Sequence, residues 1–284
     1  KGHSARFATM AVEDFPAIPK IEHGYILKIS SSELSHAISK VAIAAAVDEG
    51  RPVLTGILCE IAKDAVTMVA TDGYRLSFQR VVVSSASGGN LPVKMIVPAR
   101  AMIEVNKLIA ESTGEDSEVG NVEMIIAEGL NQLNIKISNV EFTTRVIEGS
   151  FPPWQKIIPD KFTSLVNANR EELVRLIRIA SIFARDSGNI IKLTIGPKDG
   201  SGTSVLRVAA GNKQVGSNEA EMEVALSGRG GEIAFNFRYL LEMLSSIDSE
   251  DINFQMIESL NPGRITIPEK DDYFHIVMPV RLQS

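Results

Sequence analysis

The chain has 284 residues, 44% of them hydrophobic, and a formal net charge of −6. This length accommodates one large domain or two ordinary ones, and the negative total excludes attraction to nucleic acid through net charge alone, leaving room only for a local basic face. The single Cys59 excludes an intrachain disulfide, and its apolar surroundings predict a buried thiol in a reducing, cytoplasmic environment. No apolar stretch reaches the ~20 residues of a membrane-spanning helix, so we expect no membrane association.

The first segment of the chain resembles a later one. Residues 7–16 read FATMAVEDFP, and residues 142–152 read FTTRVIEGSFP, the end of the first complete repeat described below. We therefore expect residues 1–20 to contain the last strand of an absent preceding unit and a linker. Proline-containing linkers are expected after both copies, near residues 16–19 and 151–159.

Two helices are predicted at equivalent places in two repeats. In each, apolar residues at i, i+3, i+4 and i+7 define one helical face. The faces consist of Leu34, Ala37, Ile38, Val41 and Ala45 in the first helix, and of Leu173, Leu176, Ile177, Ala180 and Ala184 in the second. The polar tripeptides at 31–33 and 169–171 precede these faces and are expected to cap the helix N-termini.

A hairpin is predicted over residues 66–78, VTMVATDGYRLSF. Apolar alternation indicates a strand on either side of Asp72-Gly73, and this dipeptide favours a tight turn because glycine accepts positive φ. The turn accounts for Asp72 and Gly73. It does not account for the aromatic Tyr74 and the cationic Arg75 that follow directly.

A second strand–helix segment also occurs twice. Residues 95–109 (MIVPARAMIEVNKLI) match residues 233–247 (IAFNFRYLLEMLSSI), with Arg100 aligned on Arg238 and Glu104 on Glu242. Downstream, residues 121–137 match residues 251–267. Each repeat thus predicts two helices and about eight strands, an α+β fold in which the helices pack on antiparallel sheets. We assign residues 21–150 to the first unit and 151–284 to the second.

Basic residues fall on the predicted outward faces of the helices. They are Lys40 in the first helix, Arg100 and Lys107 in the second, Arg175 and Arg178 in the third and Arg238 in the fourth. One interpretation is an ordinary solvated face. The other is a basic surface that holds a phosphate backbone through salt-sensitive contacts. Such contacts would not read sequence, since no base-reading motif is visible.

The sequence offers no catalytic or metal-binding pattern. The four histidines have no acidic or nucleophilic partner at a characteristic spacing, and neither a GxxxxGK[ST] phosphate loop nor a GxSxG turn occurs. Asp72 as a general base is less favoured than Asp72 as a turn residue. We expect no cofactor, no metal and no enzymatic activity.

Six motifs, in order along the chain, resemble those of one family. They are RPVLTGILCEI (51–61), VATDGYRL (69–76), IVPARAMIEV (96–105), RVIEGSFPPW (145–154), AFNFRYLLEML (234–244) and VMPVRL (277–282). Together they closely resemble the bacterial sliding clamp, the β subunit of DNA polymerase III, over essentially the whole chain. The resemblance implies three DNA-clamp modules per subunit, of which this chain would hold the second and third. It also implies a head-to-tail dimeric ring around duplex DNA that acts as a non-catalytic processivity factor.

The resemblance further implies a peptide-binding cleft between the two units. Short Gln/Leu/Phe motifs of the polymerase III catalytic subunit, the clamp loader, other polymerases and repair proteins would dock there. The implied residues are Leu54, Thr71, Gly73, Tyr74, Arg75, Leu76, Pro152, Lys156, Ile157, Met278, Pro279, Val280, Arg281 and Leu282. Apolar side chains would hold the Leu and Phe anchors, and Met278 would adapt to different partners. Backbone and Arg groups would orient the polar end of the peptide. The family often has Arg in place of Lys156, so a planar contact would be weaker here.

The resemblance places sequence-independent DNA contacts on the helices and a nearby loop. The positions are Lys40, Arg51, Arg100, Lys107, Arg175, Arg178 and Arg238. Ile182 and Phe183 would form one side of the dimer interface, whose other side belongs to the absent unit, so we expect this fragment not to close into a ring. Two alternatives are a metal-dependent nucleotidyltransferase or nuclease that uses the acidic loops with Mg²⁺, and a peptide-binding scaffold without a DNA role.

Overall fold

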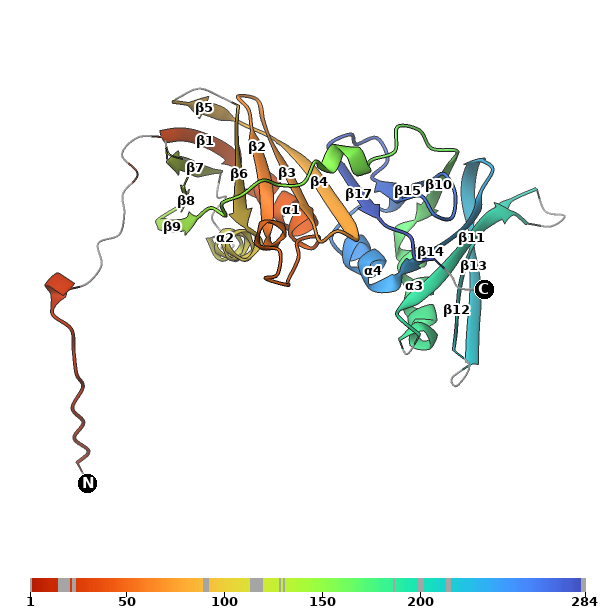
Figure 1. Cartoon of the computed structure of the whole chain (residues 1–284), viewed down its shortest axis with the longest axis horizontal. Coiled ribbons are helices and arrows are strands. Elements are labelled where there is room, and N and C mark those ends of the chain that lie inside the picture. Colours follow the sequence, from red (N-terminus) through yellow and green to blue (C-terminus); the bar gives the residue numbers. More distant parts are fainter. Residues whose placement is uncertain are drawn as a thin grey trace.

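The structure is a computed structural model that describes residues 2–14, 21, 24–88, 92–112, 120–127, 129, 131–185, 187–198, 202–212 and 216–281. It contains two similar units joined by a linker over residues 146–163 (Figure 1). Residues 2–11 form no strand and lie exposed, away from the first unit. The closing strand of a preceding unit expected in residues 1–20 stays a prediction, and the linker expected near residues 16–19 lies outside the described residues. A strand requires a neighbour to bond its backbone, and residues 2–11 have none among the described segments.

The described residues of the first unit form eleven helices and strands. They are β1 (Gly24–Ser30), α1 (Ser31–Ala42), β2 (Gly56–Ile61), β3 (Ala65–Thr71), β4 (Arg75–Val82), β5 (Ser85–Ser87), β6 (Val93–Pro98), α2 (Ala99–Ser112), β7 (Asn121–Ala127), β8 (Gln132–Ile137) and β9 (Val140–Arg145). Short 3-10 turns η1 (Val12–Asp14), η2 (Pro52–Thr55) and η3 (Trp154–Ile157) lie before the unit, within it and in the linker.

The second unit repeats this order, and its described residues form no separate counterpart of β5. Its elements are β10 (Ser164–Asn169), α3 (Arg170–Ala184), β11 (Ile190–Pro197), β12 (Ser204–Asn212), β13 (Gly216–Gly228), β14 (Gly231–Asn236), α4 (Phe237–Ser245), β15 (Asp251–Met256), β16 (Gly263–Thr266) and β17 (Tyr273–Val277). Helices α2 and α4 begin at Ala99 and Phe237, in agreement with the alignment of Arg100 on Arg238. The predicted α+β repeat is confirmed.

Side-chain capping differs between equivalent helices. Asn169 caps α3 by accepting a hydrogen bond from the Glu172 amide at 3.0 Å, and Asn236 caps α4 in the same way. Helix α1 begins at Ser31 with no side-chain cap, so the cap predicted there is wrong. The apolar faces predicted for α1 and α3 are buried as expected, from Leu34 to Val41 and from Leu173 to Ala184.

All strand pairs among the described residues are antiparallel, and one sheet crosses between the units. Its twelve strands run β14-β11-β12-β13-β10-β15-β16-β17-β4-β3-β2-β6, whereas β5-β1-β7-β8-β9 form a separate sheet. The crossing point is the pair β17–β4, where Phe274 lies opposite Phe78 and Ile276 opposite Leu76. This pair, called the junction below, fixes the two units to each other.

Each unit has its own apolar core, and a third cluster covers the junction. The two larger cores lie between the helices and the sheets, with Met102 and Phe235 among their fully buried members. The third cluster combines strands of both units with the linker and includes Leu76, Trp154 and Ile276. In the described part of the chain, no helix is long and apolar enough to cross a membrane.

Candidate functional site

The β3–β4 turn is built by its own side chains. Asp72 accepts hydrogen bonds from the backbone amides of Tyr74 (2.8 Å) and Arg75 (3.0 Å), and the Thr71 hydroxyl donates to the Arg75 carbonyl (2.6 Å). Gly73 has φ of 93°, a value that other residues adopt only with strain. The predicted turn is confirmed, and these contacts give Asp72 a structural role that follows from the sequence D-G.

Arg75 is not displayed at the surface. Its side chain is 9% exposed, forms ion pairs with Asp72 (3.1 Å) and with Glu242 of α4, and lies over the Tyr239 ring at 4.5 Å. The guanidinium is therefore committed to binding the second unit. Its Nε and Nη1 groups bind Asp72 and Glu242 inside the junction, and a role of Arg75 in orienting a docked peptide stays a prediction.

Tyr74 and the C-terminal segment are direct neighbours. The amide of Met278 donates to the Tyr74 carbonyl at 2.8 Å, extending the register of β17 against β4 by one step. Tyr74 is 61% exposed and Met278 36% exposed, so both present apolar surface at the boundary between units. The Val280 amide donates to Ala234 of β14, which holds the chain end against the second unit.

The remaining residues of the implied cleft differ in accessibility. Leu54, Thr71 and Leu76 are buried, Pro152, Ile157, Pro279 and Val280 are half-buried, and Gly73, Lys156 and Arg281 are exposed. Leu282 lies outside the described residues. Leu76 and Ile157 belong to the third cluster, so they underlie an apolar floor next to Tyr74 and Met278.

The floor contains aromatic residues that were not singled out from the sequence. Phe78 stacks on Phe274 with ring centroids 4.5 Å apart, and Trp154 approaches Phe78 at 5.5 Å. These side chains come from β4, β17 and the linker. Trp154 is the last residue of the motif RVIEGSFPPW. Nothing in its local sequence indicates that it covers the pair β17–β4, whose residues are distant from it in the chain.

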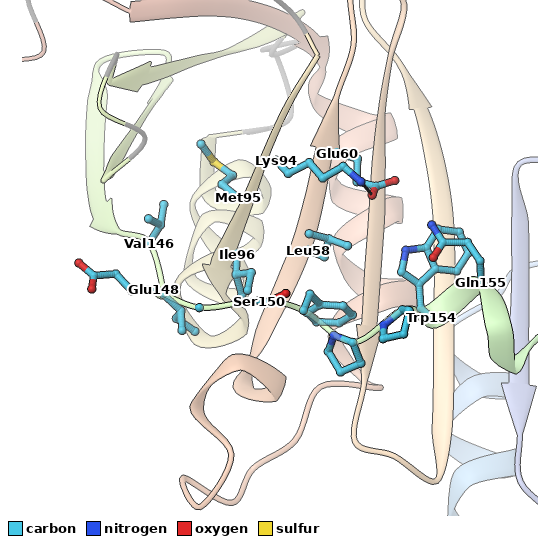
Figure 2. A pocket seen from close by; sticks show the side chains of 15 residues that line it. Leu58, Glu60, Lys94, Met95, Ile96, Val146, Glu148, Ser150, Trp154 and Gln155 are labelled. Carbon is cyan, nitrogen blue, oxygen red and sulfur yellow. Dashed lines mark hydrogen bonds and ion pairs between the residues drawn. The ribbon is translucent and has the colours of Figure 1, made fainter.

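A cavity of about 570 Å³ lies between the linker and the outer face of β2 and β6 (Figure 2). It shares Pro152 with the implied cleft, and its lining includes Leu58 and Ile96. An ion pair between Lys94 and Glu60 spans one wall. Val146 and Glu148 lie at one end of the cavity and Trp154 and Gln155 at the other.

The basic positions on α2, α3 and α4 fall into two groups. Arg100, Arg178 and Arg238 are exposed and form no ion pair with another described residue. Lys107 and Arg175 are exposed but paired with carboxylates three residues away on their own helices. Figure 1 shows the helices in the order α2, α1, α4, α3 along the long axis of the molecule.

Two further positions implied for DNA contact have local partners. Arg51 is exposed, and its guanidinium donates to the Asp72 carbonyl at 2.9 Å. Lys40 does not point outward as predicted. It is half-buried at the junction. Its Nζ lies 3.5 Å from Gln79 Oε1 and 5.4 Å from the centroid of the Tyr273 ring. Burial lowers the pKa of its ammonium group. The helical period indicated the polar side of α1 correctly but gave no sign that the second unit covers it.

Helix α3 presents apolar side chains to solvent. Ile182 and Ile179 are exposed, while Phe183 is half-buried against the core of the second unit. Ile182 and Phe183 are the two positions implied for a dimer interface. Among the described residues, no group of three or more His, Cys, Asp or Glu side chains is arranged to hold a metal ion.

Comparison with known proteins gives matches along nearly the whole chain. The family model "DNA polymerase III beta subunit, central domain" matches residues 28–153, and "DNA polymerase III beta subunit, C-terminal domain" matches residues 155–281. The beta sliding clamp of Synechocystis sp. is 28% identical over 290 residues, covering 98% of this chain and 72% of that protein.

Solved structures agree with these matches. The DNA polymerase III beta subunit of Thermotoga maritima superposes with a TM-score of 0.84 at 26% identity, covering 96% of this chain and 70% of that one. The beta subunit of Pseudomonas aeruginosa gives a TM-score of 0.85 at 25% identity, covering 97% and 71%. The chain therefore belongs to the bacterial sliding clamp family, the non-catalytic β subunit of DNA polymerase III, and comprises its central and C-terminal domains.

Proposed function

We propose that this chain forms the part of a replication clamp that holds partner proteins, through an apolar notch between its two units, on duplex DNA that the complete ring encircles. The observation that carries this proposal is the contact between Met278 and Tyr74, because it brings two exposed apolar side chains from distant segments to one place. A tethered partner that dissociates stays near the template and rebinds before it diffuses away.

The notch suits short tails with apolar anchors. Tyr74 and Met278 border it, and the cluster around Leu76 and Trp154 lies beneath. Aromatic and aliphatic anchors from a tail gain affinity by leaving water on such a surface, and the flexible Met278 adapts to tails of different shape. Partners would be the polymerase III catalytic subunit, the clamp loader, other polymerases and repair proteins that carry Gln/Leu/Phe motifs.

The junction suggests how a ring is built. By position in the repeat, β9 corresponds to β17, and residues 216–224 of β13 correspond to β4. In the described structure β9 pairs only with β8, and residues 216–224 pair only with β12. Both ends thus carry an unpaired strand edge of the kind that the junction joins. Repeating one head-to-tail contact generates a ring when the rotation closes, which supports a head-to-tail homodimer for the complete protein.

Duplex DNA would lie against the helices. Arg100, Arg178 and Arg238 offer three guanidinium groups without carboxylate partners in the described residues. Such groups attract phosphates at any sequence, and each contributes little on its own, so the contact allows sliding. Ring closure supplies the topological hold that these weak contacts lack.

Peptide titration tests the notch. We expect a fluorescent Gln-Leu-Phe peptide to bind the intact chain, and Tyr74→Ala or Met278→Ala to weaken binding by about tenfold, the usual effect of losing an interface anchor. Leu260→Ala is the matched control, because Leu260 is an exposed apolar residue in the turn between β15 and β16. Equal affinity in all four proteins would remove the notch from the proposal.

A further inference from the structure

We propose that the cavity beneath the linker is a second docking segment for the same partner tails, one that takes an extended stretch with an apolar side chain followed by a basic residue. The inference rests on the proposed docking of tails at Tyr74 and Met278. It extends the binding site from Pro152 toward Glu148. It also predicts that an apolar residue followed by a basic one is preferred after the Leu-Phe anchors of the tail.

The groove is continuous with the notch. Leu58 and Ile96 in its wall belong to the same apolar cluster as Leu76 beneath the notch, and Pro152 borders both sites. Pro152 and Ile157 are half-buried apolar residues of the implied cleft, and we place the Leu-Phe end of a Gln-Leu-Phe motif beside them. A tail bound in this direction leads its C-terminal continuation into the groove.

One hydrogen-bond donor in the groove lacks an acceptor. Trp154 lines the groove and only 8% of its surface is exposed. Its indole Nε1–H has no hydrogen-bond partner among the described residues. A buried donor without a partner is costly, so an acceptor that reaches it is favoured. The carbonyl of an extended peptide backbone is such an acceptor, and because Nε1 has almost no accessible surface, the indole ring has to turn toward the groove to meet it.

The charges of the groove favour a basic residue at its far end. Lys94 is paired with Glu60, which cancels one charge of each sign, whereas Glu148 is exposed and has no ion-pair partner in the described residues. The groove therefore carries one uncompensated negative charge. It lies at the end opposite Trp154.

The linker backbone leaves room for an added strand. The Ile147 amide donates to the Ile96 carbonyl at 2.7 Å, which ties the linker to β6 at one point. The amides of residues 148–151 donate to no other described residue. Four extended residues span about 13 Å, so a short continuation of the tail can run from Pro152 to Glu148 beside these free amides.

Three acetylated peptides with amidated C-termini test the groove: Gln-Leu-Phe alone, the same peptide extended by Ala-Leu-Ala-Lys, and the extension with Glu in place of Lys. Each is titrated against the full chain. We expect the peptide extended by Ala-Leu-Ala-Lys to bind about tenfold more tightly than Gln-Leu-Phe, as burial of one Leu side chain implies. The peptide with Glu in place of Lys should bind about threefold more weakly than the Lys peptide.

The indole resonance of Trp154 locates the extension. Trp154 is the single tryptophan, so a ¹⁵N-labelled sample shows one indole N–H peak. We expect this peak to move downfield with the extended peptide and to move far less with Gln-Leu-Phe. Glu148→Lys should reverse the preference between the Lys and Glu peptides. Glu111→Lys, at an exposed position of α2, makes the same charge change outside the groove and should leave the preference unchanged.

The outcomes separate the groove from the notch. If Gln-Leu-Phe binds and the extension adds neither affinity nor an indole shift, the groove is refuted while the notch stands. If Gln-Leu-Phe does not bind, the notch is refuted, and acetyl-Ala-Leu-Ala-Lys-amide at millimolar concentration is then tested alone. If the chemical shift of the Trp154 indole N–H does not change in that experiment, the proposed groove is refuted as well.

Discussion

The two units end in strands that occupy the same place in the repeat but meet different surroundings. Strand β17 pairs with β4 of the first unit, and all five of its residues are buried. Within the described residues, strand β9 has one free edge, and none of its six residues is buried. The sequences follow this difference, YFHIV against VEFTTR. The comparison teaches that the closing strand joins two units where a neighbouring strand covers it, and that its burial depends on that neighbour.

The largest effect is expected from truncating the paired strand. Phe274 and Glu141 occupy equivalent positions in the two units. Phe274 lies opposite Thr266 and Glu141 lies opposite Lys136, and Thr266 and Lys136 align in the repeat. Phe274→Ala should lower the free energy of unfolding by about 3–5 kcal/mol, because it empties a stacked aromatic site at the junction. Glu141→Ala should stay within about 0.5 kcal/mol, as its exposed ion pair contributes little. Urea unfolding of both variants measures the contrast, and similar losses would contradict it.

A smaller loss is expected from releasing the ion pairs of the junction. Arg75→Ala leaves the Asp72 carboxylate without its guanidinium and removes the contact with Tyr239, so we expect a loss of about 2 kcal/mol in the free energy of unfolding. Arg80→Ala is the matched control on the same strand, because its pair with Asp64 is exposed and should matter by less than about 0.5 kcal/mol. If Arg75→Ala were as stable as the control, the guanidinium would not fasten the units.

Acid should weaken the junction through His275. This residue of β17 is fully buried, neither ring nitrogen has a hydrogen-bond partner in the described structure, and burial together with Arg75 lowers its pKa to about 3. The folded chain stays neutral at His275, while the unfolded chain takes up a proton below its ordinary pKa of about 6.5. Stability attributable to His275 is therefore present above pH 6.5 and falls by about 1.4 kcal/mol per pH unit between about 6.5 and 3.

Unfolding free energies at pH 7.5, 6 and 5 measure this slope. The difference between the intact chain and His275→Leu isolates the histidine from the carboxylates that also titrate in acid. We expect the leucine variant to lose less stability on acidification, whereas His36→Leu, at an exposed position on α1, should follow the intact chain. Parallel curves for His275→Leu and the intact chain would contradict the prediction.

The smallest expected effect is on self-association. Strand β9 lacks the buried apolar residues of β17, and β13 carries Glu219, Glu221 and Glu223 on exposed positions. Charged edges discourage pairing, so β9 and β13 alone should not hold two copies of this chain together, and in the proposed ring each edge would pair with a strand of a further unit. We predict a single monomeric species in sedimentation velocity at micromolar concentration, with no ring-like dimer. A stable dimer would show that the edges alone suffice.

The sequence by itself determined the local structure and the repeat. The Asp72-Gly73 turn, the apolar faces of α1 and α3 and the equivalence of α2 and α4 follow from turn chemistry, periodicity and self-similarity, which act over a few residues or along one element. The resemblance to the sliding clamps rested on the same short motifs. These patterns were sufficient to place Tyr74 on a hairpin and Met278 near a strand end.

Only the tertiary structure decided which polar side chains are available. Arg75 and Lys40 belong to polar stretches of the sequence, yet both are covered by the second unit, with Glu242 and Tyr273 as partners from residues about 170 to 230 positions away. Trp154 likewise gained its aromatic neighbours from β4 and β17. Periodicity tells which side of an element is apolar, but burial of the other side depends on contacts between segments that are far apart in the chain, and those exist only once the units have packed.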